Sequence, residues 1–302
     1  MKSEQLQLIE AQLRAQPFST DMSVADMRSA YDAMGGMFPL PEGLRTEQVT
    51  ANGVPCVRFK ALSAAEDRTI LYLHGGGYVI GSTTSHGWLC AKLSEAAGIT
   101  VLGVDYRLSP EHRHPAPIAD ATAAYRWLLE QGIQPGRIVV AGDSAGGGLT
   151  VATLMALRDA GVPTPAAGVC ISPWVDLEMT GGSITERAAA DPIVFRELLD
   201  LLATHYRGDV AANSPLISPM YGDLRGLPPL LIQVGTAETL YDDATRLADR
   251  ARAAGVTVAL ETWEDMFHVW HMFAGALPDA QQAIDRIGQF VKERTGSVAG
   301  VA

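Results

Sequence analysis

Short apolar runs alternate with longer amphipathic stretches along most of this 302-residue chain. Apolar runs bounded by turn residues are typical of buried strands, and the amphipathic stretches have the period of helices. The pattern predicts strands at residues 69–74, 100–105, 137–142, 166–172, 230–234 and 256–262. It predicts helices at residues 85–97, 117–131, 145–160, 242–254 and 279–293. This alternation indicates an α/β fold with a mainly parallel sheet and helices on both faces.

Two further strands are predicted ahead of this alternation, at residues 46–51 and 54–61. They are joined by Asn52 and Gly53, and an Asn-Gly pair between two strands favours a tight β-hairpin. Together with the six alternating strands, the hairpin completes a mostly parallel eight-stranded sheet.

Two segments fall outside the alternation. Residues 4–15 and 24–34 are predicted to form N-terminal helices, and residues 172–230 carry turn residues and then a helical stretch at 193–206. Ligands of parallel sheets bind at the carboxyl ends of the strands, where this insertion emerges. We therefore interpret the insertion and the N-terminal helices as a helical cap over a site, with a purely structural crossover helix as the alternative.

Composition narrows the classes of function. With 23 basic and 34 acidic residues the net charge is −11, which argues against a nucleic-acid partner. No apolar run is long enough for a membrane span, and the first residues lack the basic and apolar segments of a signal peptide. The three cysteines are sparse and lack metal or redox spacing, so we expect a cytoplasmic protein with reduced thiols.

The sequence Gly-Asp-Ser-Ala-Gly at residues 142–146 follows a predicted strand and precedes a predicted helix. A Gly-x-Ser-x-Gly in that position is typical of a nucleophile elbow, in which a strained turn exposes the serine above the sheet. The flanking glycines allow strand and helix to approach closely. We predict that Ser144 is a nucleophile.

A serine nucleophile needs a base and an acid, which follow it in the chain in this architecture. His268 comes soon after the last predicted strand and is favoured as the base over His271 and His205. Glu238 is the first carboxylate after the strand at 230–234, and is favoured as the acid over Asp242.

The sequence His-Gly-Gly-Gly at residues 74–77 follows another predicted strand and offers backbone N–H groups to a developing oxyanion, together with that of Ala145. Glycine-rich loops also bind phosphate, but the Lys-Ser/Thr and Gly-x-Gly-x-x-Gly patterns of nucleotide sites are missing from the sequence. A metal site is not expected, because the histidines at 112 and 114 lack an acidic companion at ligand spacing.

These motifs resemble the hormone-sensitive-lipase-like branch of the α/β-hydrolase superfamily, the bacterial family IV esterases. The matching segments are residues 74–77, 105–111 with Pro115, 142–147, 172–174, 191–192 and 266–268. The resemblance implies an α/β-hydrolase fold with N-terminal cap helices at 1–45, core at 46–175, a cap insertion at 176–214 and core at 215–302. It also implies a homodimer, and a reaction that needs no cofactor.

In residue terms, the resemblance implies Ser144 as nucleophile, His268 as base and Glu238 at the acid position, with Gly76, Gly77 and Ala145 as oxyanion donors. Most relatives carry Asp where this chain has Glu238, so the loop must accommodate one extra methylene. Candidate walls of the substrate pocket are Tyr78, Phe38, Trp88 and Phe195. We further expect Asp105, Arg107 and Asp143 to pair with one another and brace the loops of the site.

The predicted function is a serine carboxylesterase acting on a small-molecule ester, and the resemblance suggests short acyl chains. An amidase or a deacetylase would use the same three groups and would differ in pocket shape. A non-catalytic small-molecule-binding protein on the same fold is the alternative from a different class.

Overall fold

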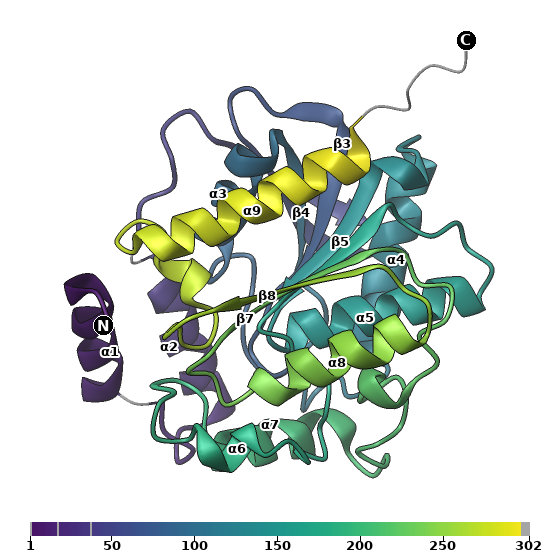
Figure 1. Ribbon diagram of the computed structural model, residues 1–302. Helices are drawn as coiled ribbons and strands as arrows, with labels where there is room; N and C mark the ends of the chain where they lie inside the picture. The colour runs from purple at the N-terminus through teal and green to yellow at the C-terminus, as the bar shows by residue number, and fades with distance from the viewer. Residues whose placement is uncertain (1, 17, 37, 297–302) are drawn as a thin grey trace.

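The computed structural model describes residues 2–16, 18–36 and 38–296. In these residues eight strands form one sheet in the order β1-β2-β4-β3-β5-β6-β7-β8 (Figure 1). Their bounds are β1 Arg45–Ala51, β2 Val54–Lys60, β3 Ala65–Leu73, β4 Ile99–Val104, β5 Ile138–Asp143, β6 Ala167–Ile171, β7 Leu230–Gly235 and β8 Val258–Trp263. Strand β2 runs antiparallel to both β1 and β4, and every later pairing is parallel. The predicted fold class is confirmed.

The hairpin has the predicted turn, because Asn52 and Gly53 both have positive φ, of 49° and 87°. That combination suits a type I′ turn, whose twist matches the flanking strands. Strand β3 begins at Ala65, before the predicted start at residue 69. The pairing with β4 shifts register between Ala65 and Thr69, and the intervening polar residues hide this irregular end from the apolar pattern.

Helices cover both faces of the sheet (Figure 1). Helices α3 (Gly87–Ala97) and α9 (Pro278–Thr295) pack together on one face, and α4 (Ala116–Glu130), α5 (Ala145–Asp159) and α8 (Tyr241–Ala253) lie on the other. The buried side chains accordingly form two large clusters separated by the sheet.

The remaining helices, α1 (Glu4–Ala15), α2 (Val24–Gly35), α6 (Ser183–Glu186) and α7 (Arg196–Arg207), lie outside these two layers (Figure 1). The guanidinium group of Arg14 in α1 donates hydrogen bonds to the carbonyls of Ala189 and Ala190, so the N-terminal segment touches the insertion far along the chain. Among the described residues, no helix combines the length and the apolar composition that crossing a bilayer requires.

Candidate active site

Ser144 occupies a strained turn between β5 and α5. Its φ is 52° and its ψ is −121°, a backbone conformation that costs about 1–3 kcal/mol for a residue with a side chain. The turn needs both glycines: a Cβ on Gly146 would lie 1.9 Å from the carbonyl oxygen of Leu73, and one on Gly142 would lie 2.4 Å from the same atom. The chain therefore forms the predicted elbow, with Ser144 at the N-terminus of α5, where the helix dipole favours negative charge.

His268 lies in the loop that follows β8. Its Nδ1 is 3.0 Å from Oε2 of Glu238, in the loop after β7. Because a carboxylate only accepts, Nδ1 carries the proton in the neutral ring and Nε2 is left as an acceptor. His268 and Ser144 line the same cavity. The Ser144 hydroxyl has no hydrogen-bond partner among the described residues, and such catalytic contacts often tighten only when substrate binds.

The carboxylate of Glu238 is fully buried and held at both oxygens. Oε1 accepts hydrogen bonds from the hydroxyl of Ser172 at 2.7 Å and from the N–H of Gly235 at 2.6 Å, and Oε2 faces His268. These contacts fix the side chain of Glu238 at both carboxylate oxygens.

Ser172 is a functional residue that the sequence reasoning did not single out. It follows β6 with a φ of 45°, and its Oγ also accepts the N–H of Val269, the residue after the histidine. One hydroxyl thus ties the acid loop to the histidine loop. The only sequence signal was its place in the Ser-Pro-Trp segment at 172–174.

Electrostatics favour a charged His268 beside Glu238. Burial lowers the pKa of His268, but the hydrogen bond and negative charge of Glu238 outweigh it, and the net shift is upward from 6.5. Burial raises the pKa of Glu238, and the contacts to His268, Gly235 and Ser172 oppose that rise. An imidazolium formed at this position is therefore stabilised by its neighbour.

The competing candidates have other partners. His271 is buried and its Nε2 lies 2.7 Å from the side-chain oxygen of Gln233; burial lowers its pKa to about 3. Asp242 accepts the N–H of Ser183 in the insertion. His205 lies in α7, half-buried. Of these histidine and carboxylate candidates, the structure brings His268 and Glu238 into contact, and His268 lines the cavity of Ser144.

The glycine loop after β3 has two backbone conformations that favour glycine, with φ of 108° at Gly76 and 60° at Gly77. Both residues line the cavity of Ser144, and their N–H groups have no acceptor among the described residues. The N–H of Gly75 is different, because it donates to Oδ1 of Asp143 at 3.0 Å. This leaves Gly76, Gly77 and Ala145, the first residue of α5, as groups that can face an oxyanion.

Asp143 couples the elbow to this loop. Its buried carboxylate accepts the hydroxyl of Tyr72 at 2.6 Å as well as the N–H of Gly75, and Nε2 of His86 lies 3.2 Å away. Burial would raise the pKa of Asp143, but His86 and Tyr72 reverse that effect and hold it below its usual range. The carboxylate is therefore a fixed charge behind the glycine loop.

The predicted pairing of the charged residues with one another was wrong. Asp105 accepts from the backbone and hydroxyl of Thr83, and Arg107 forms an ion pair with Asp120 at 2.7 Å. Each charge is satisfied by a partner from an element adjacent in the fold, which spacing along the chain does not reveal.

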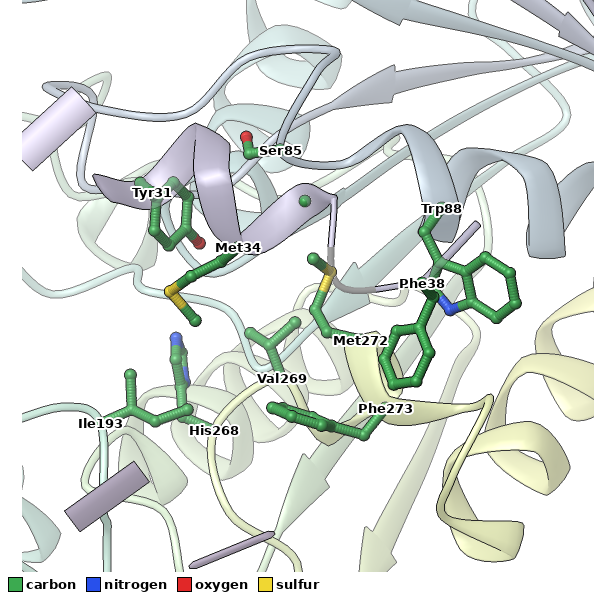
Figure 2. Close-up of a pocket in the computed structure, with 11 residues that line it drawn as sticks. Tyr31, Met34, Phe38, Ser85, Trp88, Ile193, His268, Val269, Met272 and Phe273 are labelled. Atoms are coloured by element: carbon green, nitrogen blue, oxygen red, sulfur yellow. The ribbon is translucent and has the colours of Figure 1, made fainter. Parts of the chain in front are cut away.

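Two cavities meet at His268. The serine cavity is lined by Ser144, Gly76 and Gly77 as well as His268; the histidine cavity, shown in Figure 2, is lined by His268 but not by Ser144 or these glycines. Of the predicted wall residues, Phe38 and Trp88 line the histidine cavity.

Tyr78 and Phe195 line neither of these two cavities. Tyr78 is 1% exposed, and its ring stacks on Tyr206 of α7 with 3.7 Å between centroids. Phe195 is half-buried at the first turn of α7. Tyr78 belongs to the large apolar cluster that includes residues of the core and of the insertion, and Phe195 packs against that cluster.

No group of three histidine, cysteine, aspartate or glutamate side chains suited to a metal occurs within the described ranges.

The model of a family described as alpha/beta hydrolase fold matches residues 70–272. The "Acetyl-hydrolase" of Streptomyces hygroscopicus is 45% identical over 300 residues, which cover 98% of this chain and 99% of that protein.

Solved structures agree with these sequence matches. An esterase from the bacterial hormone-sensitive lipase family superimposes with a TM-score of 0.96 at 50% identity, covering 98% of this chain and 100% of that one. The protein EstE5, in a crystal soaked with p-nitrophenyl butyrate, superimposes with a TM-score of 0.94 at 40% identity and the same coverage.

Proposed function

Since this chain belongs to the α/β-hydrolase family, and within it to the ester hydrolases related to bacterial hormone-sensitive lipase, we propose that it hydrolyses esters through Ser144, His268 and Glu238. The observation that carries the proposal is the buried hydrogen bond from His268 Nδ1 to Glu238, beside a cavity that His268 shares with Ser144. Nδ1 is committed to the carboxylate, so Nε2 is the atom that exchanges protons with the serine and the substrate.

In the first half of the reaction, the Ser144 oxygen bonds to the ester carbonyl carbon while its proton moves to Nε2 of His268. The carbonyl π electrons move onto oxygen, which becomes an oxyanion facing the N–H groups of Gly76, Gly77 and Ala145. These donors are held by the fold before substrate arrives, so they stabilise the charge without reorganisation. When the oxyanion collapses, the bond to the alcohol oxygen breaks and that oxygen takes the proton from His268.

In the second half, water attacks the acyl-enzyme as its proton moves to Nε2 of His268. Collapse of the new oxyanion breaks the bond to the Ser144 oxygen, which recovers the proton while the carboxylic acid leaves. Glu238 keeps the imidazole in one tautomer and stabilises the imidazolium in both halves, and it takes no proton itself.

The acyl groups we propose are short, from acetyl to hexanoyl. Support comes from the name of the acetyl-hydrolase relative and from the butyrate ester soaked into the EstE5 crystal. The first of these also supports a second candidate, the removal of acetyl groups from a larger alcohol, which the same groups would perform.

The test is kcat/KM on p-nitrophenyl esters from acetate to dodecanoate, with Ser144→Ala as the blank. We expect a maximum at short chains and a loss of about 10⁴-fold or more in the blank. A blank that keeps more than a tenth of the rate would refute Ser144 as nucleophile. A maximum at dodecanoate would refute the short-chain preference and leave the nucleophile standing.

We also propose that residues 1–45 and 176–214 form one cap over a core of residues 46–175 and 215–302. We propose in addition that the protein is cytoplasmic. Finally, we propose that it forms a homodimer through β8 and α9. Strand β8 supports the dimer because it ends the sheet and has a neighbour on one side only, β7, in the described structure. Three buried, unpaired cysteines are compatible with a reducing compartment. Light scattering of the purified protein tests the dimer.

A further inference from the structure

The loop that carries Glu238 is held from two sides. The carboxylate of Glu238 is held by Ser172, Gly235 and His268, which all lie outside the insertion. The next residue, Thr239, is fully buried, and its backbone and hydroxyl groups are hydrogen-bonded to the insertion instead. Two neighbouring residues of one loop thus have their partners in different parts of the molecule.

Three hydrogen bonds join Thr239 to the insertion at residues 176–214. Its N–H donates to Oδ2 of Asp191 at 2.9 Å, and its hydroxyl donates to the carbonyl of Val194 at 2.9 Å. Its carbonyl accepts from the hydroxyl of Ser183 at 2.7 Å. Each polar group of Thr239 is satisfied by a different residue of the insertion, so the acid loop can shift only by breaking buried contacts.

We propose that Thr239 is a positioning residue for the acid: by anchoring Thr239, the insertion keeps Glu238 in place against His268. This inference rests on the proposed function of Glu238 and His268, and it gives the insertion a role in the chemical step besides covering the cavities. Thr239 lines neither the serine cavity nor the histidine cavity, so it acts through its neighbour in the chain.

The contact between Glu238 and His268 depends on a precise position of the acid loop. Nδ1 of His268 lies 3.0 Å from Oε2 of Glu238, and a hydrogen bond weakens steeply as it lengthens or bends. Groups that act in catalysis must be held within about 0.5 Å of the productive geometry by the residues around them. Because Thr239 follows Glu238 directly, its three hydrogen bonds fix the backbone from which the carboxylate extends.

The segment that anchors Thr239 also forms part of the cavity walls. Oδ1 of Asp191 accepts the N–H groups of Ile193 at 3.0 Å and Val194 at 3.1 Å, while its Oδ2 accepts that of Thr239. Ile193 lines both cavities, and Figure 2 shows it among the side chains around the histidine cavity. The buried carboxylate of Asp191 therefore connects a wall of both cavities to the loop that carries the acid.

The charges around His268 provide a readout of the position of Glu238. Burial lowers the pKa of His268, and the carboxylates of Glu238, Asp191 and Asp143 raise it. Glu238 has the largest of these raising effects, because it also accepts the hydrogen bond from Nδ1. A displaced Glu238 would lower this pKa. Since the neutral imidazole is the active base, the acidic limb of kcat/KM would then move to lower pH.

The test removes one hydroxyl and keeps the shape of the side chain. Thr239→Val breaks the contact to the carbonyl of Val194 and retains the backbone contacts, and Thr239→Ser restores a hydroxyl. Thr69→Val is the matched control. Thr69 is also buried, and its hydroxyl also donates to a backbone carbonyl, that of Thr100 at 3.2 Å. It pairs with the first residue of β5, at the opposite end of that strand from Ser144.

We expect Thr239→Val to lower kcat on p-nitrophenyl acetate by about tenfold, with KM within about twofold of wild type. The midpoint of the acidic limb of kcat/KM should move to lower pH in the same variant. Thr239→Ser should recover most of kcat and the wild-type midpoint. Thr69→Val should lower the melting temperature, as Thr239→Val does, but should leave kcat and the midpoint at their wild-type values.

An unshifted midpoint in Thr239→Val would overturn the proposal. Equal losses of kcat in Thr239→Val and Thr69→Val would also overturn it, because the hydroxyl would then contribute only to stability. Ser183→Ala guards against misfolding of Thr239→Val: it removes the donor to the Thr239 carbonyl and should shift the midpoint in the same direction, and an unshifted midpoint counts against the proposal. Failure of the proposed function looks different, since wild-type hydrolysis would then be missing or would survive in Ser144→Ala.

Discussion

The two sides of the serine cavity are built in opposite ways. On the core side, Glu238 and Asp143 are fully buried, each with three polar neighbours, and Ser144 and Gly76 have positive φ. On the outer side, the cavity is lined by apolar side chains, including Met34, Ile193 and three leucines of α7, Leu198, Leu199 and Leu202. One side is held by directional hydrogen bonds, and the other by packing that accepts changes of shape.

The difference separates activity from selectivity. Buried polar networks tolerate few arrangements, because each unpaired group costs about 1–3 kcal/mol. Apolar walls can change volume at a modest cost when the side chain is partly exposed. Substitutions on the core side should therefore reduce the rate on all esters, and substitutions on the outer side should change which ester is preferred.

The largest effect on kcat is expected from a substitution of Glu238, the proposed acid on the core side. Glu238→Gln should reduce kcat by about 10⁴-fold, because an amide cannot accept from Nδ1 with a full charge and can impose the wrong tautomer. Asp242→Asn is the matched control, since Asp242 contacts Ser183 rather than His268, and its kcat should stay within about threefold of wild type. Steady-state kinetics on p-nitrophenyl acetate measures both. A larger loss of kcat in Asp242→Asn than in Glu238→Gln would assign the role of the acid to Asp242.

A smaller effect is expected behind the oxyanion loop. Asp143→Asn weakens the acceptor that holds the N–H of Gly75, and should reduce kcat by about 10²-fold with little change in KM. Asp120→Asn removes another buried carboxylate, which pairs with Arg107 instead. It should lower the melting temperature without the same loss of kcat. Equal losses of kcat in the two variants would mean that Asp143 acts only through stability.

The pH profile tests the coupling of His268 and Glu238. His268 is active as a base when neutral, so kcat/KM should fall as the pH drops through its pKa, with a midpoint above 6.5. Glu238→Gln removes the charge that raises this pKa, so the residual activity should have its midpoint at a lower pH than the wild type. An unshifted midpoint would show that another group sets the acidic limb.

The smallest effect on rate is expected on the outer side. Met34 lines both cavities and is 36% exposed, so Met34→Ala should leave the melting temperature nearly unchanged. The kcat/KM for methyl acetate should change by less than about tenfold, while discrimination among larger esters weakens. Competition between methyl acetate and methyl octanoate measures this directly. A rate loss on methyl acetate as large as that of Asp143→Asn would erase the distinction between the two sides.

Much of the fold could be predicted from the sequence because its signals are local. The apolar runs, the Asn-Gly turn and the glycines of the elbow act through neighbours in the chain, and the structure has these elements with shifts of a few residues at their ends, as at Ala65. The histidine and acid candidates were ranked by distance from strand ends, and parallel strands bring those ends to one edge.

The sequence by itself determined the chemistry available to this protein: a strained serine, a glycine loop and a histidine and a carboxylate after the last two strands. Only the tertiary structure decided which side chains meet. In the folded chain the ring of Tyr78 stacks on Tyr206, and Asp143 accepts a hydrogen bond from the N–H of Gly75. The hydroxyl of Ser172 donates to Glu238 and accepts from the N–H of Val269. Those contacts join residues up to 128 positions apart (206 minus 78), and no local propensity encodes them; they depend on strand order and on how the outer helices pack.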